Sequence, residues 1–194
     1  MRVRVDALAA AKSELRARVR RDLAALAPAR RALEEEVVQA AIQSDPVWAR
    51  ARTVLLYKAV APEFSVVGLT LAAWRQGKRT LFPRVDGPGR LTLHEVSSWT
   101  DLQPGAYGIP EPKADGRPRV PPADVDLAIV PGVAWDAQGH RLGRGGGFYD
   151  RLIPELKGPA WGVGFDAQWT ATLPVGEWDA QVAKVWLATP LGLL

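Results

Sequence analysis

The sequence predicts one α/β domain whose sheet is mainly parallel. Short apolar runs of strand length recur from about residue 53 onward, and helical stretches separate several of them. The runs are almost continuously apolar, which is typical of strands that are buried on both faces. At 194 residues the chain is long enough for one well-buried core, so we expect a single domain over residues 1–194.

The first elements are expected to be a pair of helices. Apolar residues recur at helical spacing between positions 8 and 26 in an Ala- and Arg-rich stretch, and Pro28 ends that pattern. Proline fits the first turn of a helix, so a second helix is expected from Pro28 to about Ile42. A Ser-Asp-Pro turn at 44–46 closes it.

Strands and helices then alternate. A strand over Thr53–Tyr57 is followed by a helix over about 66–74, which Gly77 ends. A later helix is predicted over 147–156. The segment 103–122 holds six prolines and three glycines and is interpreted as an extended loop across the surface or the site. Further strands are predicted at 79–85, 91–96, 126–131, 161–165 and 184–188.

The composition excludes several kinds of site. The chain has no cysteine, which excludes disulfides, thiolate catalysis and Cys-based zinc sites, and its two histidines lack an HExxH spacing. Any metal is therefore expected on oxygen ligands. No apolar stretch approaches the roughly 20 residues of a membrane span, and the N-terminus has no apolar signal core, so we expect no membrane contact and a cytoplasmic location.

Positive charge is concentrated near the N-terminus. Residues 1–31 hold nine Lys and Arg against three Asp and Glu, within a chain of net charge +4. Such a segment can bind nucleic acid, bind a small polyanionic substrate, or form a solvated helix face, and charge alone leaves these three interpretations open.

The densest signal is the run from Arg141 to Asp150, which places glycines between an apolar strand and a helix start. Glycines allow positive φ and close approach of a ligand, and the unpaired N–H groups of a helix start favour an anion such as phosphate. Arg141 and Arg144 add forked donors. The alternative is a turn whose arginines face water. The run matches neither the P-loop nor the GxGxxG pattern.

Asp150 lies in the first turn of the predicted helix that follows this run. Its carboxylate could bind Mg²⁺ held by phosphates, because Mg²⁺ prefers one or two carboxylates together with phosphate and water. A first-turn acid favoured by the helix dipole is an equal alternative.

Two segments of this region, Pro131-Gly-Val-Ala-Trp-Asp136 and Arg141-Leu-Gly-Arg-Gly-Gly-Gly-Phe-Tyr-Asp150, closely resemble the signature of 5-formyltetrahydrofolate cyclo-ligases, also called 5,10-methenyltetrahydrofolate synthetases. The resemblance extends over nearly the whole chain. It implies a three-layer α/β fold similar to the sugar-phosphate isomerase and CoA-transferase group, with an N-terminal helical pair. Further matching segments are Lys12-Ser-Glu-Leu-Arg16, Tyr57 to Glu63, Phe82-Pro-Arg84 and Tyr107-Gly-Ile-Pro-Glu-Pro112.

The resemblance implies that the chain uses ATP and Mg²⁺ to cyclise 5-formyltetrahydrofolate to 5,10-methenyltetrahydrofolate, releasing ADP and phosphate. It implies catalytic roles for Arg144 and Lys12, and a metal-binding role for Asp150. The folate substrate would be bound by Glu63, Tyr107, Arg144 and Phe148. ATP would be bound by Lys12, Arg16, Arg141, Leu142, Gly143, Arg144, Gly145, Gly146, Gly147, Phe148 and Tyr149.

The chemistry of these side chains suits the implied roles, although each has an alternative. Lys12 and Arg16 are four residues apart and so share a helix face, but each would otherwise be interpreted as a surface cation. Glu63 can accept two N–H bonds from a flat heterocycle, and alone it would be a loop acid. Tyr107 can stack on a ring of the folate or serve only in packing.

One departure concerns the metal. The family commonly has a second metal-linked Asp shortly before the last strand, where this chain has Ala183, and Asp179 matches a different acidic position. The alternative function is therefore a non-catalytic paralogue that binds folate, nucleotide or RNA. No alternation of basic and aromatic residues indicates RNA binding, so we expect no nucleic-acid partner, and a monomer or weak dimer.

Overall fold

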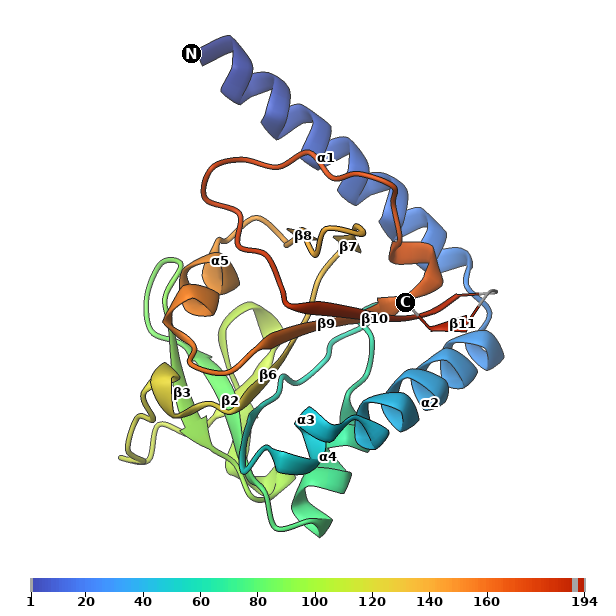
Figure 1. Cartoon of the computed structure of the whole chain (residues 1–194). Coiled ribbons are helices and arrows are strands. Elements are labelled where there is room, and N and C mark those ends of the chain that lie inside the picture. Colours follow the sequence, from blue (N-terminus) through green and yellow to red (C-terminus); the bar gives the residue numbers. More distant parts are fainter. Residues whose placement is uncertain (1, 190–191, 194) are drawn as a thin grey trace.

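The computed structural model describes residues 2–189 and 192–193 as helices around one seven-stranded sheet (Figure 1). Met1, Pro190, Leu191 and Leu194 belong to the predicted single domain but lie outside the described residues. The strand order is β11-β10-β9-β6-β1-β2-β3. Within the described part of the chain, no helix has the length and apolar character needed to cross a bilayer.

Five strands of this sheet are parallel, as the apolar runs predict. The two strands at the edges pair antiparallel with their neighbours: β3 (Leu91–Glu95) with β2, and β11 (Gly192–Leu193) with β10. The parallel strands are β1 (Thr53–Leu55), β2 (Arg79–Val85), β6 (Leu127–Val130), β9 (Ala160–Phe165) and β10 (Lys184–Thr189).

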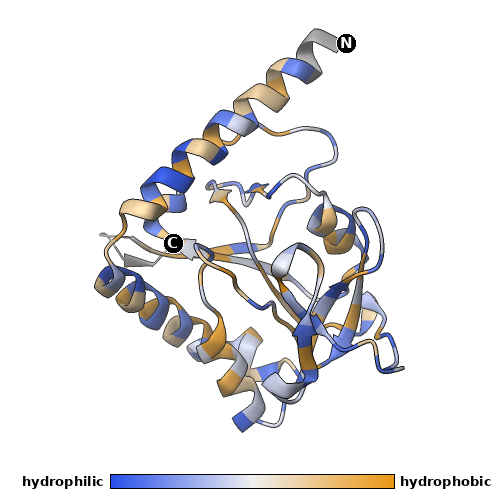
Figure 2. Ribbon diagram, turned by 180° about the vertical axis from the view of Figure 1, so that it is seen from behind, coloured by the Kyte–Doolittle hydropathy of each residue, from blue (hydrophilic) through white to orange (hydrophobic). Residues whose placement is uncertain are grey.

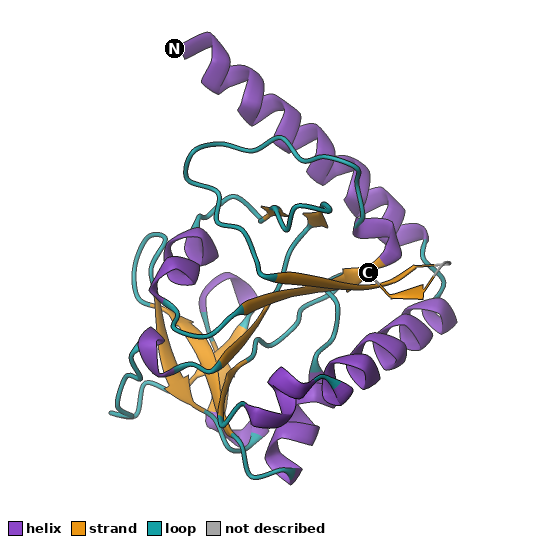
Figure 3. Ribbon diagram, viewed as in Figure 1, coloured by secondary structure: helices purple, strands orange, loops and turns teal. Residues whose placement is uncertain are grey.

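Helices cover both faces of the sheet, which gives three layers (Figure 3). One face packs against the helices of the first half of the chain, and the other packs against α5 (Phe148–Leu152) and the 3₁₀ turn η4 (Ile153–Glu155). The expected N-terminal helical pair is present. The helices on the first face are α1 (Arg2–Ala25), α2 (Pro28–Ser44), α3 (Pro46–Arg50) and α4 (Val67–Arg75).

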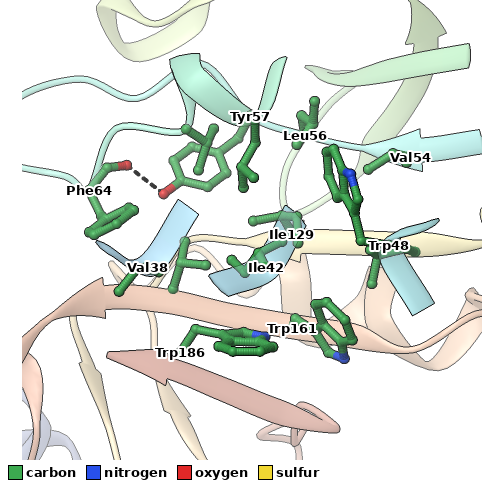
Figure 4. Packing of buried hydrophobic residues seen from close by; sticks show 14 of the residues in the cluster. Val38, Ile42, Trp48, Val54, Leu56, Tyr57, Phe64, Ile129, Trp161 and Trp186 are labelled. Atoms are coloured by element: carbon green, nitrogen blue, oxygen red, sulfur yellow. Dashed lines mark hydrogen bonds between the residues drawn. The ribbon is translucent and has the colours of Figure 1, made fainter. Parts of the chain in front are cut away.

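Successive side chains of the central strands alternate between the two cores. Val54 and Leu56 enter the core beneath α2 and α4, whereas Leu55 enters the core beneath α5, and all three are fully buried. Figure 4 shows Val38 and Ile42 of α2 stacked over Trp161 and Trp186 of the sheet. Burial of each such side chain contributes about 1.5–3 kcal/mol. Figure 2 shows the apolar colour concentrated on the strands and on part of each helix.

Three short features go beyond the sequence-based prediction. Asp45 ends α2 and also caps α3, because its side chain accepts a hydrogen bond from the Val47 N–H at 2.8 Å. The Pro-rich segment, predicted as a plain loop, contains a hairpin of β4 (Leu102–Pro104) and β5 (Pro110–Pro112). A second hairpin, β7 (Ala134–Trp135) with β8 (Arg141–Leu142), precedes the glycine-rich run.

The strand order has a switch point at β1. From β1 the chain moves outward to β2 and β3 on one side, and it returns later to build β6, β9 and β10 on the other side. In open α/β sheets a crevice forms at the carboxyl ends of the strands where the order reverses, and ligands bind there. The ends of β1 and β6 are therefore the expected position of a site.

The Trp135 side chain packs against glycines of the sheet, where any larger residue would overlap its ring. Its indole is fully buried, and a Cβ added at Gly162 on β9 would lie 2.3 Å from the ring atom Cζ3. The indole therefore rests directly on the β9 backbone and fixes the β7–β8 hairpin above the sheet.

We expect Gly162→Ala to destabilise the fold by about 1–3 kcal/mol, because the added methyl overlaps the indole. Urea unfolding measures this loss. In a Trp135→Phe background the same substitution should destabilise the fold less, because phenylalanine lacks the indole atoms that the added methyl would overlap. Equal costs in the two backgrounds would contradict this packing.

Candidate active site

A cavity of about 600 Å³ opens at the carboxyl ends of β1 and β6. Tyr57 and Glu63 line it from the segment after β1, and Pro131, Gly132 and Val133 line it from the segment after β6. The cavity thus lies at the switch point of the sheet, where parallel α/β folds bind ligands.

The glycine-rich run forms one wall of this cavity. Gly145 and Gly147 have φ of 107° and 65°, a region that other residues adopt only with strain, and Gly147 leads directly into α5. The Arg16 Nε donates a hydrogen bond to the Gly143 carbonyl at 2.8 Å, so α1 holds the loop in place. Burial lowers the pKa of the Arg16 guanidinium, while the nearby Asp179 carboxylate acts in the opposite direction.

Arg141 is buried at the base of the loop. Its Nη2 donates to the Asp150 Oδ1 at 2.7 Å, and its guanidinium lies 5.5 Å from the centre of the Tyr149 ring. Its Nε has no hydrogen-bond partner within the described residues. Arg141 therefore brings a cation and an unused donor to the site.

Arg144 and Glu63 connect the two sides of the cavity. The Arg144 Nη2 lies 2.8 Å from the Glu63 Oε1, and the Val60 N–H donates to the Glu63 Oε2 at 3.0 Å. Burial raises the pKa of the Glu63 carboxyl, although the Val60 N–H and the Arg144 charge both lower it. The Arg144 side chain is half exposed and has room to turn toward a ligand.

Two aromatic rings lie at the mouth of the cavity. Tyr107 belongs to the turn η2 (Ala106–Gly108) between β4 and β5, and its φ of 57° is unusual for a residue other than glycine. Its ring meets that of Phe148 edge to face with centroids 6.2 Å apart, and the residue is 76% exposed. The exposed ring can pack against a flat ligand.

Most of the residues that the sequence predicts for the site line this one cavity, but two do not. The Lys12 Nζ lies 2.5 Å from the Asp179 Oδ2, outside the cavity lining. Leu142 is buried beneath the loop and contributes packing. The residues brought together are Arg16, Glu63, Tyr107, Arg141, Gly143, Arg144, Gly145, Gly146, Gly147, Phe148, Tyr149 and Asp150.

Sequence reasoning missed four polar residues of the lining: Arg20, Lys58, Glu111 and Gln168. Signals for three of them were present. Arg20 lies one helical turn after Arg16, and Lys58 and Glu111 lie in two of the segments that resemble the family. No local pattern indicates Gln168, whose amide donates to the carbonyls of Gly132 and Val133.

The described residues contain no group of three or more His, Asp or Glu side chains that could hold a metal by themselves. Asp150 offers one carboxylate to the cavity, and its Oδ1 accepts from Arg141 while no hydrogen bond of its Oδ2 is described. A single carboxylate fits Mg²⁺ that takes most of its ligands from phosphate and water.

Asp136 organises the backbone that leads into the loop. Its carboxylate, almost fully buried, accepts hydrogen bonds from the His140 ring and from the backbone N–H groups of Gln138, His140 and Leu173. Burial opposes ionisation of this carboxyl, but the hydrogen bonds outweigh burial and hold its pKa below the usual range. Asp136 thereby joins the β7–β8 turn to the segment around Leu173.

A cavity at the switch point of a mainly parallel sheet, lined by arginines, a glycine-rich loop and aromatic rings, defines an α/β protein with a ligand site at the carboxyl ends of its strands. Comparison with known families identifies the group. The model of the 5-formyltetrahydrofolate cyclo-ligase family matches residues 8–188, and the chain belongs to this family.

Individual relatives agree with the family model. The chain is 35% identical over 147 residues to the 5-formyltetrahydrofolate cyclo-ligase of Escherichia coli K12, covering 70% of this chain and 81% of that protein. It is 25% identical over 193 residues to the mouse protein of the same name, covering 90% and 92% of the two chains. The structure of 5,10-methenyltetrahydrofolate synthetase from Aquifex aeolicus superposes with a TM-score of 0.79 at 37% identity, covering 91% of this chain and 89% of that one.

We expect Asp136→Asn to destabilise the protein by about 2–3 kcal/mol near neutral pH, because an amide cannot accept all the hydrogen bonds that the carboxylate accepts. The depressed pKa of Asp136 provides stability above its unfolded pKa of about 3.9, and this stability is lost as pH falls through the folded-state pKa.

The difference in unfolding free energy between wild type and Asp136→Asn should therefore stay constant above about pH 5 and shrink as the pH falls below that value in urea titrations. Asp124→Asn is the matched control, because Asp124 is exposed and its side chain has no hydrogen bond within the described residues. A difference that also stays constant below about pH 5 would contradict the assignment.

Proposed function

We propose that this chain carries out its family's reaction, the ATP-dependent cyclisation of 5-formyltetrahydrofolate to 5,10-methenyltetrahydrofolate, in the cavity at the ends of β1 and β6. The formyl oxygen attacks the γ-phosphorus of ATP and ADP leaves. N10 then attacks the activated formyl carbon and loses its proton, and inorganic phosphate departs with the oxygen. The observation that carries the proposal is that one cavity combines the loop 143–147 and Arg16 with Glu63 and the aromatic rings.

The loop and its arginines form the proposed ATP side. The N–H groups of Gly143–Gly147 and the guanidinium groups of Arg16, Arg141 and Arg144 are the donors that developing charge on a transferred phosphoryl group requires. Positioning and charge neutralisation supply most of the catalysis of such a transfer, so the lack of cysteine is no obstacle. Lys12 joins this group when its amine exchanges Asp179 for a phosphate oxygen.

Glu63 and two aromatic rings form the proposed folate side. Glu63 can accept N–H bonds from the pterin, and Tyr107 and Phe148, which follows the loop, can pack against the rings. Arg144 lies between the two sides, because it contacts Glu63 and belongs to the loop. In this proposal Arg144 turns to the formyl oxygen and the phosphoryl group, which gives it the central catalytic role.

Asp150 is the proposed protein ligand of Mg²⁺. When bound with ATP, the ion would neutralise charge on the phosphates. The ion pair with Arg141 holds the Asp150 carboxylate in position. It also neutralises both charges, so neither group is left unpaired in a largely buried place.

The second candidate function, a non-catalytic paralogue, is favoured only by Ala183, which provides no carboxylate near the C-terminal strand. Absorbance of the methenyl product separates the two functions, because only an enzyme forms this product in proportion to the ATP supplied.

We also propose a cytoplasmic location, where ATP is supplied, and a monomer or weak dimer. Cell fractionation tests the location, and sedimentation tests the oligomeric state.

We expect Arg144→Ala to lower kcat about 10²–10³-fold, because it removes a donor that acts on developing charge. The half-exposed side chain contributes little to folding, so the thermal midpoint should change little. Arg21→Ala, on the exposed surface of α1, is the control and should leave kcat unchanged. Near-normal cyclisation by the Arg144 variant would remove the central role given to Arg144.

We expect Asp150→Asn to raise the Mg²⁺ concentration for half-maximal rate by about tenfold, because a neutral amide binds the ion less tightly. A Mg²⁺ titration at saturating ATP measures this shift, with thermal unfolding as a check on Arg141, which loses its ion partner. A reduced rate with an unchanged Mg²⁺ requirement would contradict metal binding by Asp150 and would leave it only the role of ion partner to Arg141.

A further inference from the structure

Glu111 is an acidic residue in the cavity wall that the proposed reaction leaves unused. It is the middle residue of β5, it is only 8% exposed, and it lines the cavity. Within the described residues, its carboxylate forms no ion pair and no hydrogen bond, although the backbone of β5 pairs with β4. Its oxygens are not among the fully enclosed polar atoms that lack a partner, so the carboxylate reaches the open space of the cavity, where the N–H group of a ligand can donate to it.

The other two acidic residues of the lining differ from Glu111. Glu63 is held by Arg144 and the Val60 N–H, and Asp150 is held by Arg141. Both of these carboxylates are therefore neutralised by protein cations before any ligand binds. Glu111 alone keeps its full capacity to accept hydrogen bonds, which is up to four N–H or O–H donors for an ionised carboxylate.

The hairpin is shaped to keep Glu111 free. Its neighbours Pro110 and Pro112 have no N–H groups, so neither can donate to the carboxylate. A Cβ added at Gly105, across the turn, would lie 2.5 Å from the Glu111 Cγ and Cδ, so only glycine leaves room for this side chain. The turn between them positions Tyr107 at the mouth of the same cavity.

The surroundings of Glu111 suit a flat ring system more than a phosphate. β5 packs against β2, and apolar side chains from β2, β3 and the hairpin line the cavity there. An anionic carboxylate in such a wall repels phosphate but accepts bonds from ring or amide N–H groups. The apolar residues that line this part are Phe82, Pro83, Val85, Leu91, Ile109 and Pro110.

We infer that Glu111 is a binding residue for the reduced folate, accepting a hydrogen bond from one of its N–H groups and so helping to select this substrate. The inference rests on the proposed function, because it takes the folate as the flat ligand of the cavity. It adds to the site a second carboxylate that differs from Glu63 in being unpaired until the ligand binds.

Two substitutions test this role. Glu111→Leu keeps the approximate volume but removes every acceptor, and it should raise the KM for 5-formyltetrahydrofolate by about tenfold or more while the KM for ATP stays within about twofold. Glu111→Gln keeps one acceptor oxygen and should fall between wild type and the Leu variant. Because the Leu variant removes an unpaired buried carboxylate, its thermal midpoint should equal or exceed that of wild type.

Glu36→Leu, an exposed substitution on α2, is the control and should leave both KM values unchanged. An active Glu111→Leu enzyme with the wild-type KM for folate would overturn the inference. A raised KM for ATP alone would also overturn it, and would indicate that Glu111 contacts the adenine of ATP instead.

Direct binding of 5-formyltetrahydrofolate, followed by tryptophan fluorescence without ATP, separates this inference from the proposed function. If wild type shows no ATP-dependent cyclisation but binds folate more tightly than the Leu variant does, the cyclo-ligase proposal fails and the role of Glu111 stands. If wild type cyclises and the two proteins bind folate equally, the role of Glu111 fails alone.

Discussion

The position of β1 between β2 and β6 is the constraint on which the remaining structure depends. Because β1 has strands on both sides and apolar side chains on both faces, helices must cover it from above and below. The helices that follow β1 and β6, α4 and α5, pack on opposite faces of the sheet, and the segments after the carboxyl ends of these two strands line the cavity. Fold and site are thus consequences of one strand arrangement.

Two arginines of the cavity have carboxylate partners before a ligand arrives. Arg144 is paired with Glu63 and Arg141 with Asp150, and outside the cavity lining Lys12 is paired with Asp179. In the proposed function, the phosphates of ATP would replace Glu63 as the partner of Arg144, and this exchange costs less than exposing a bare charge would. This arrangement keeps the basic groups ordered and available at the same time.

Local sequence patterns predicted the parallel strands, the first two helices and the glycine-rich loop, because each depends on periodicity or on glycine within a few residues. Three features had no such pattern. The hairpins β4–β5 and β7–β8 lie in Pro- and Gly-rich segments that resemble loops, and Asp45 begins α3 where only a turn was indicated. The pairing of Lys12 with Asp179 joins residues 167 positions apart, which only the folded structure can bring together.

The contact between Arg16 and the Gly143 carbonyl joins the first helix of the chain to a loop in its last third. During synthesis, α1 leaves the ribosome long before the loop and the strands β9 and β10 that support it exist. The contact that holds the loop 143–147 can therefore form only after most of the chain has been made. In the proposed function, the complete ATP site then exists only once synthesis has passed Asp150.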